Sequence, residues 1–154
     1  MTSGVTHIFF EPLSYTLDAL GNVKSYVENT NIKTMRLNVI ASCGAKYFEL
    51  PSSVEMVDND TNCFGGANSN CVITIKENMT KIPAKLFASY PGEIRMLGSS
   101  DNIIRLPSLT FIGKNAFAGA SQMGKHEFIL PSTLTLDGYI GNNAKSIRFG
   151  EPGN

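Results

Sequence analysis

The residues of this chain that could do acid–base or metal chemistry are few and scattered. His7 and His126 lie far apart in the sequence, and neither adjoins a nucleophile or a second metal-ligating side chain. A histidine titrates near neutral pH, but it needs more context than these two show before it can be assigned a switch or a catalytic role. We therefore expect both histidines to be structural or surface residues.

Oxygen-bearing side chains in residues 58–62, Asp-Asn-Asp-Thr-Asn, resemble the start of a calcium-binding loop. The rest of that motif differs, because Cys63 stands at the glycine position and Ser69 at the position of the bidentate glutamate. A loop without this glutamate binds calcium poorly. The sequence therefore favours a plain polar turn over a calcium site.

The cysteines and the known catalytic motifs give no support to an enzyme. Cys43, Cys63 and Cys71 form an odd, sparse set without metal-type spacing, which favours small buried side chains in a reducing compartment over a disulfide framework. The chain contains no GxSxG elbow, Walker loop, dinucleotide fingerprint or HExxH helix. We therefore expect a non-enzymatic protein without a cofactor.

The charge balance and the N-terminus exclude several classes of partner. The chain has 13 Lys plus Arg and 13 Asp plus Glu, so it lacks the basic excess of a nucleic-acid-binding protein. No apolar run reaches the length of a membrane span. Residues 1–12 show neither a basic leader nor a long apolar segment. We expect a chain made in the cytoplasm, and association with a virion or a surface stays open.

An internal repeat must provide the scaffold for any site. Leu50, Ile75, Leu106 and Leu130 occupy equivalent positions that are 25, 31 and 24 residues apart. Two of these spacings fit a leucine-rich repeat, and the longer one indicates an insertion, which we place in a rim loop near residues 92–101. Such units cannot bury their own apolar faces, so neighbouring units must stack into one continuous core.

Each unit begins with a short alternating segment and continues to an aromatic residue. The alternation predicts a short half-buried strand, and a proline ends it in three of four units because proline cannot donate a ladder hydrogen bond. Stacked strands of this kind predict a parallel ladder. The aromatic residues, each flanked by small residues, predict a stacked core spine rather than a ligand site. They are Phe64, Phe87 and Phe117.

The repeat decays towards both ends of the chain. Residues 1–45 fit its register poorly, and we interpret them as an N-terminal cap or docking segment, followed by the solenoid in 46–154 with a C-terminal cap. Within the N-terminal segment, residues 17–27 are compatible with a short helix broken by Gly21, and residues 35–40 with an extra strand.

The best-formed unit, residues 106–120, reads Leu-Pro-Ser-Leu-Thr-Phe-Ile-Gly-Lys-Asn-Ala-Phe-Ala-Gly-Ala. It resembles the repeat of the BspA-like leucine-rich repeat family, and residues 50–54 and 130–134 match the opening of that repeat. The resemblance covers roughly residues 46–136. It implies a mainly β, right-handed leucine-rich repeat solenoid with short 3-10, helical or irregular turns and no active site. Members of that family are mostly surface proteins concerned with adhesion and host-protein binding, and related repeats occur in viral proteins.

A partner would bind where the strands face outward. Alternation turns one set of residues away from the core, and we call these eight residues the outward strip. They are Tyr47, Glu49, Val72, Thr74, Ile103, Arg105, Glu127 and Ile129, with Arg148 as a continuation. The strip is more apolar than a solvated face requires, which favours a protein or glycan contact surface, although ordinary β-propensity on an open sheet explains it equally well.

Two functions follow from this interpretation. The first is a non-enzymatic interaction or adhesion module that binds a protein or glycan through the strip. The second is a structural decoration component of a larger assembly, such as a virion or surface layer, docked through residues 1–45 and able to assemble with other copies.

Overall fold

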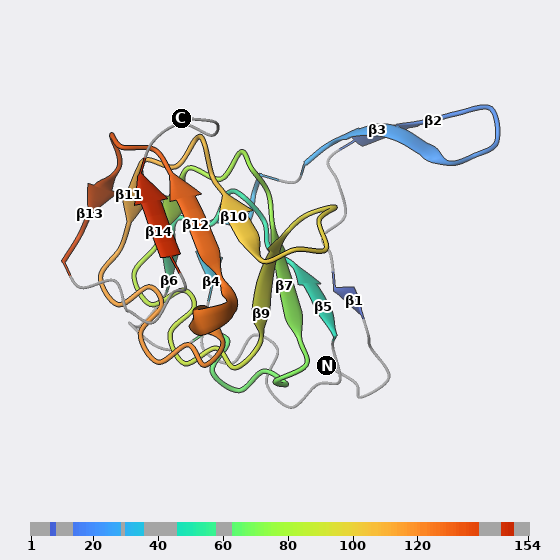
Figure 1. The fold of residues 1–154 in the computed structure, drawn as a ribbon. Coiled ribbons are helices and arrows are strands. Elements are labelled where there is room, and N and C mark those ends of the chain that lie inside the picture. The colour runs from blue at the N-terminus through green and yellow to red at the C-terminus, as the bar shows by residue number, and fades with distance from the viewer. Residues whose placement is uncertain are drawn as a thin grey trace.

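The computed structural model of the chain describes residues 7–8, 14–28, 30–35, 46–57, 63–138 and 146–149. These residues form short β-strands and one 3-10 helix, η2 (Met123–Lys125). Parallel strands stack into a β-solenoid of about 4 turns, which confirms the mainly β solenoid with parallel ladders expected from the repeat. Figure 1 shows this stacked body, with a separate hairpin extending from it.

One wall of the solenoid carries the longer strands and forms two separate parallel sheets, with the orders β1-β5-β7-β9 and β10-β12-β14. We call these the N-terminal and the C-terminal sheet, and the outer surface of the wall the strand face. The strands are β1 (His7–Ile8), β5 (Tyr47–Glu49), β7 (Val72–Ile75), β9 (Glu93–Met96), β10 (Ile103–Arg105), β12 (Glu127–Leu130) and β14 (Ser146–Phe149).

The second wall consists of two-residue strands. Three of them form a parallel sheet in the order β13-β11-β8, and two more, β4 and β6, pair with each other. Their bounds are β4 (Thr34–Met35), β6 (Met56–Val57), β8 (Lys81–Ile82), β11 (Phe111–Ile112) and β13 (Thr135–Leu136). Because β1 pairs with β5 and β4 with β6, both walls include residues from before position 46.

The aromatic residues of the repeat form the predicted spine through the core. The ring centroids of Phe64 and Phe87 lie 6.2 Å apart, and those of Phe87 and Phe117 lie 5.4 Å apart, both pairs stacked. Phe48 and Phe128 close the two ends of this row with edge-to-face contacts. The stacking of equivalent side chains joins successive coils into one core, as the repeat pattern predicts.

The corners between β8 or β11 and the next strand explain the small residues beside the phenylalanines. Asn115 and Lys85, which are equivalent in the two units, both have a φ near +60° (59° and 62°). Gly119 and Ser89 form a second such pair, at 74° and 59°. Glycine and asparagine adopt this left-handed conformation at little cost, which accounts for the Asn-Ala-Phe-Ala-Gly sequence of the best-formed unit.

The insertion differs from the predicted rim loop. Residues 93–96 form β9, an extra strand that pairs with β7, and the loop of residues 97–102 then leads directly into β10. In the second wall β8 pairs with β11 without an intervening strand. The sequence Glu-Ile-Arg-Met alternates like a strand, and Ile94 is buried in the core. The insertion therefore adds a strand to one wall only.

The expected helix in residues 17–27 is wrong, because this segment is an antiparallel hairpin of β2 (Ser14–Leu17) and β3 (Val23–Val27). The Asp18 carboxylate accepts hydrogen bonds from two backbone N–H groups of the turn, and Gly21 has a φ of +86°. A local turn and β-favouring side chains thus prevail over weak helical spacing. Of the strand expected in residues 35–40, the structure shows β4; residues 36–40 lie outside the described part.

Candidate functional site

The strand face brings all eight residues of the outward strip onto one wall, in two rows across the strands. Tyr47 and Val72 are cross-strand neighbours in the N-terminal sheet, as are Ile103 and Glu127 in the C-terminal sheet. The second row places Glu49 beside Thr74 and Arg105 beside Ile129. The alternation argument therefore placed these residues on one wall, but it did not predict the strand that separates the two groups.

That strand is β9, whose outward residues Glu93 and Arg95 continue the two rows next to Val72 and Thr74. The sequence reasoning missed both, because the segment was assigned to a loop. Its alternating Glu-Ile-Arg-Met pattern was the available signal. Ile129 also departs from expectation: its side chain is only 8% exposed.

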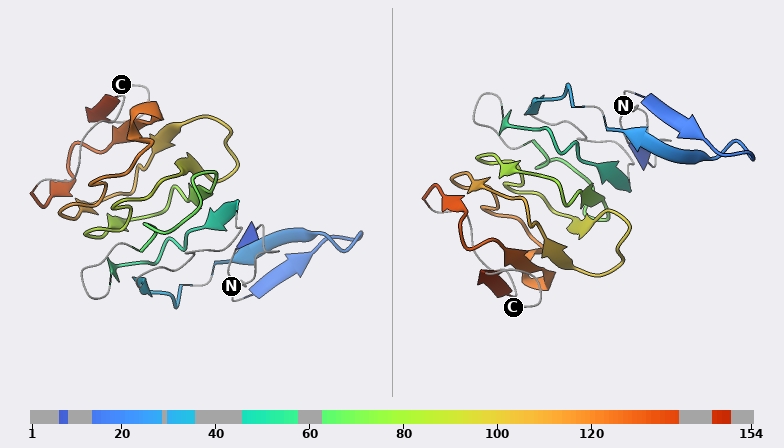
Figure 2. Two further views of the ribbon diagram at one scale, coloured as in Figure 1. Left: turned by 90° about the horizontal axis from the view of Figure 1, so that it is seen from below. Right: turned by 90° about the horizontal axis from the view of Figure 1, so that it is seen from above.

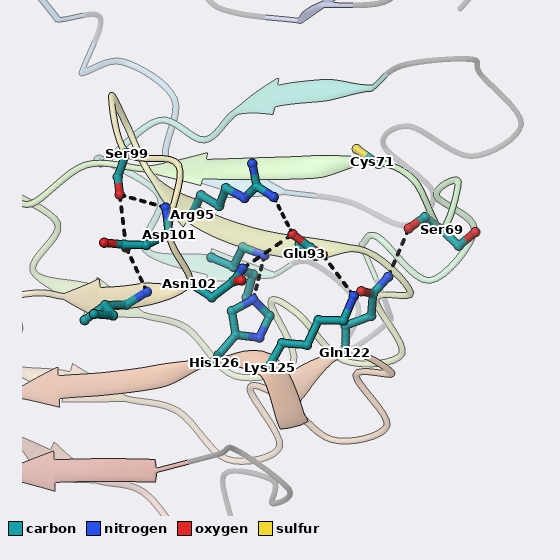
Figure 3. A network of polar contacts seen from close by, with 12 residues as sticks. Ser69, Cys71, Glu93, Arg95, Ser99, Asp101, Asn102, Gln122, Lys125 and His126 are labelled. Atoms are coloured by element: carbon teal, nitrogen blue, oxygen red, sulfur yellow. Dashed lines mark hydrogen bonds and ion pairs between the residues drawn. The ribbon is translucent and has the colours of Figure 1, made fainter.

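The junction between β9 and β10, which we call the seam, joins the two sheets without ladder pairing. The imidazole Nε2 of His126, just before β12, accepts a hydrogen bond of 2.9 Å from the Ile94 backbone N–H (Figure 3). This bond requires a neutral ring with its proton on Nδ1. His126 is buried, and burial lowers its pKa below the usual value. The His126 side chain thus accepts a hydrogen bond that a backbone carbonyl of a neighbouring strand would accept in a continuous sheet.

Hydrogen bonds to the Glu93 carboxylate connect the elements at one edge of the seam. The Glu93 carboxylate accepts hydrogen bonds from Arg95 at 2.8 Å, from Lys125 of η2 at 3.1 Å and from Asn102 at 3.4 Å (Figure 3). The Lys125 bond, followed by those from Arg95 and Asn102, lowers the pKa of Glu93. These contacts tie β9, the 97–102 loop and η2 together, so the charges of Glu93 and Arg95 are engaged within the protein.

A second ion-pair cluster anchors the base of the hairpin to the N-terminal sheet. Both carboxylate oxygens of Glu28 accept hydrogen bonds, from the backbone N–H and hydroxyl of Ser52, from Lys76 and from Asn78. Burial raises the pKa of Glu28, but these bonds outweigh it and bring the pKa to about 2. Lys76 also pairs with Glu49 at 3.0 Å, so this residue of the strip serves a structural ion pair.

The C-terminal sheet presents its charges differently. Arg105 and Arg148 flank Ile129 at the same register position on β10, β12 and β14, and both arginines are exposed. In the described part of the chain, neither guanidinium has a hydrogen bond or an ion pair. A cleft of about 310 Å³ lies here, lined by Ile103, Arg105, Glu127, Phe128, Ile129 and Arg148.

An adjoining cleft of about 420 Å³ shares Ile103 and Arg105 with the first and extends across the seam towards the 97–102 loop. Figure 2 shows this loop projecting from the same side of the solenoid as the strands of this wall. Its lining residues are Lys76, Glu77, Met96, Leu97, Ser99, Ile103 and Arg105.

Other chemistry has little basis in the described residues. Cys63 and Cys71 are buried and form no disulfide, and burial raises the pKa of Cys63 to about 11, which makes its thiol a poor nucleophile. Within the described ranges, no three His, Cys, Asp or Glu side chains converge as metal ligands would, and residues 58–62 lie outside these ranges. None of the described helices is long and apolar enough to span a membrane.

Comparison with known proteins adds no relative to this picture. No protein-family model, curated protein or solved structure matches the chain.

Proposed function

We propose that the protein is a non-enzymatic interaction module of the adhesion or recognition type, which binds a protein or glycan partner through its strand face. The observation that carries this proposal is the continuous outward surface formed by the parallel strands of one wall, with two adjoining clefts in its C-terminal half. Solenoids use extended surfaces of this kind to bind partners. We also propose that the chain is a divergent member of the BspA-like leucine-rich repeat family.

The test compares the two walls with matched substitutions. Thr74→Arg places a bulky charge in the middle of the strand face, and Thr135→Arg places the same charge on an exposed position of β13 in the second wall. Glu49 is unsuitable for such a test, because its substitution would also leave Lys76 with one partner fewer.

Wild-type protein is first applied to arrays of purified extracellular proteins and glycans, and the strongest ligand is then titrated against both variants. We expect Thr74→Arg to abolish binding and Thr135→Arg to leave it unchanged, with circular dichroism confirming that both fold. The reverse pattern would contradict a binding role for the strand face.

The hairpin favours a second candidate, the structural component docked through its N-terminal segment. β2 and β3 pack chiefly on each other and project away from the solenoid in both views of Figure 2. Leu17, Leu20, Tyr26 and Val27 are between 49% and 86% exposed. A two-stranded hairpin is marginally stable in water by itself, so these apolar side chains favour a covering partner.

Replacing residues 14–27 by a short Gly-Ser linker tests this second candidate without removing β1 and β4 from the solenoid. If the hairpin mediates assembly with other copies, sedimentation velocity should show concentration-dependent oligomers for the full chain and monomers for the variant. A full chain that stays monomeric at every concentration would exclude this self-assembly.

A further inference from the structure

We propose that the C-terminal half of the strand face binds an acidic peptide, with one carboxylate held between Arg105 and Arg148 and a nearby apolar side chain seated in the adjoining cleft. This inference rests on the proposed function and names the chemical class of the partner.

The first step is the position of the two arginines. The register places them on either side of Ile129, two strand spacings or about 10 Å apart at their backbones. An outward residue of an open sheet is 8% exposed only if its neighbours cover it, and the residues beside it on both adjacent strands are these arginines. Because long cationic side chains commonly lay their aliphatic stems over apolar surface, we infer that both arginines cover part of Ile129, and both line one cleft.

The second step is the charge of this cleft. Two cations on one small surface repel each other, and among the described residues neither Arg105 nor Arg148 has a hydrogen bond or ion pair. Asp101 interacts electrostatically with Arg105, but its carboxylate accepts hydrogen bonds from the Ile103 N–H and from Ser99 within the loop. Glu127 lines the same cleft, but it lies in the other row of the ladder, opposite Ile103. A ligand carboxylate would complete the arginine pair, because the guanidinium fork matches its two oxygens.

The third step is the apolar component. The adjoining cleft is lined by Met96, Leu97 and Ile103 besides its polar residues, and Leu97 is 46% exposed. Every second residue of an extended peptide points to the same side, roughly 7 Å further along. A peptide that crosses the strands can therefore place an apolar side chain in this cleft and an acidic side chain between the arginines.

The lining favours a peptide over the other polyanions. Sugar rings bind best on exposed aromatic faces, but the aromatic residue that lines one of these clefts, Phe128, is buried, and the exposed Tyr47 belongs to β5, in the other sheet. A nucleic acid would require an extended basic surface, whereas this chain has a net charge of zero. Two guanidinium groups beside aliphatic side chains fit a short segment with both acidic and apolar residues.

The experiment uses a fluorescent peptide in which one leucine and two glutamates alternate with serines, titrated by anisotropy against the full chain at low salt. We expect Arg105→Gln and Arg148→Gln each to weaken binding about tenfold or more, since each removes a charged hydrogen-bond donor. Lys81→Gln, which removes one exposed cation from the second wall, should leave binding unchanged. Arg105→Lys should weaken binding as well, because it keeps the charge but loses the fork.

Matched peptides separate the two components. Replacing the glutamates by glutamines, or the leucine by serine, should each weaken binding. Equal binding by Arg105→Gln and Lys81→Gln would overturn the proposal, and so would arginine-dependent binding of a sulfated glycan without binding of the peptide. If Thr74→Arg abolishes binding of an array ligand while Arg105→Gln does not, the peptide inference fails and the strand face remains the interaction surface.

Discussion

The two sheets of the strand face share one core but differ in what they do with their outward charges. In the N-terminal sheet, Lys76 pairs with Glu28 and Glu49, and Arg95 pairs with Glu93. In the C-terminal sheet, Arg105 and Arg148 point into a cleft without such partners among the described residues. The first sheet therefore uses its charges to hold the hairpin and the seam in place, whereas the second has two cations without an ion pair among the described residues. The ion pairs of each charged side chain must therefore be known before a charged surface of this solenoid is interpreted as a binding site.

The seam explains how two such different sheets can belong to one wall. β9 is an extra strand without a counterpart in the second wall, so the ladder of the strand face ends at β9 and begins again at β10. The backbone hydrogen bond that β9 lacks at this point is supplied by the His126 side chain. Three substitutions test this division into a shared core, a paired sheet and a seam.

The largest effect is expected at the shared core. Phe87→Ala removes the central ring of the aromatic spine, which is 0% exposed and stacks between Phe64 and Phe117. We expect a loss of about 3–5 kcal/mol in the free energy of unfolding, measured by urea denaturation. Phe149→Ala, at a side chain that is 49% exposed, is the control and should cost about 0.5 kcal/mol or less.

Because the spine passes behind both sheets, Phe87→Ala should retain a single transition at lower denaturant. Two separate transitions would show that the sheets fold independently, and would contradict the conclusion that they share one core.

An intermediate effect is expected in the paired sheet. Glu28→Gln should destabilise the protein by about 1–3 kcal/mol, because it weakens hydrogen bonds at a partly buried charged group. The folded pKa of about 2 lies below the ordinary 4.5, so this stabilisation is complete above pH 4.5 and is lost as the pH falls towards 2. Glu55→Gln removes an exposed ion pair with Lys33 and is the matched control.

Thermal melts of both variants and the wild type between pH 2 and 7 provide the measurement. If Glu55→Gln costs as much as Glu28→Gln, the cluster at the hairpin base is no more than a surface ion pair.

The smallest effect on the free energy of unfolding is expected at the seam, and it should depend on pH. The neutral His126 ring must accept the Ile94 N–H, and burial holds its folded pKa below 6.5. Between that folded pKa and 6.5 the unfolded state binds more protons, so stability falls as the pH falls, by about 1.4 kcal/mol per pH unit at most. The charges of Glu93 and Lys125 also influence the pKa of this ring, Glu93 raising it and Lys125 lowering it.

His126→Gln offers a carbonyl oxygen to the same N–H and cannot titrate. In chemical denaturation below pH 6.5, the free energy of unfolding of the variant should therefore depend less on pH than that of the wild type, and His7, present in both proteins, cancels in the difference. If the free energy of unfolding of the variant keeps the wild-type dependence on pH, His126 does not cause this pH dependence.

Much of the fold was predictable because a repeat restates the same local information. The alternation around Phe48, Ile73, Ile104 and Phe128 was sufficient to predict the parallel strands of one wall, and the recurrent phenylalanines the spine. The hairpin was mispredicted because residues 17–27 have no repeat to compare with and carry only weak periodicity. The strand β9 was missed because it interrupts the register instead of following it.

The eight residues of the outward strip show where sequence reasoning about the site ends. Their presence on one wall follows from the period-two alternation of a strand, which is a local property. Their ion pairs and neighbours depend on residues far away in the chain. Lys76, which pairs with Glu49 of the strip, also binds Glu28, 48 positions away. Arg148 lies beside Ile129 only because the coils stack.

By itself, then, the sequence determined a stacked β-solenoid with an aromatic core and a set of side chains on the outer surface of one wall, since these depend on patterns within each unit. Only the tertiary structure decided that an extra strand splits the wall, that His126 completes the seam, and that Arg105 and Arg148, which have no ion pair among the described residues, line one cleft. The physical reason is that charge pairing and strand neighbourhood depend on which coil stacks on which, and local sequence does not encode that order.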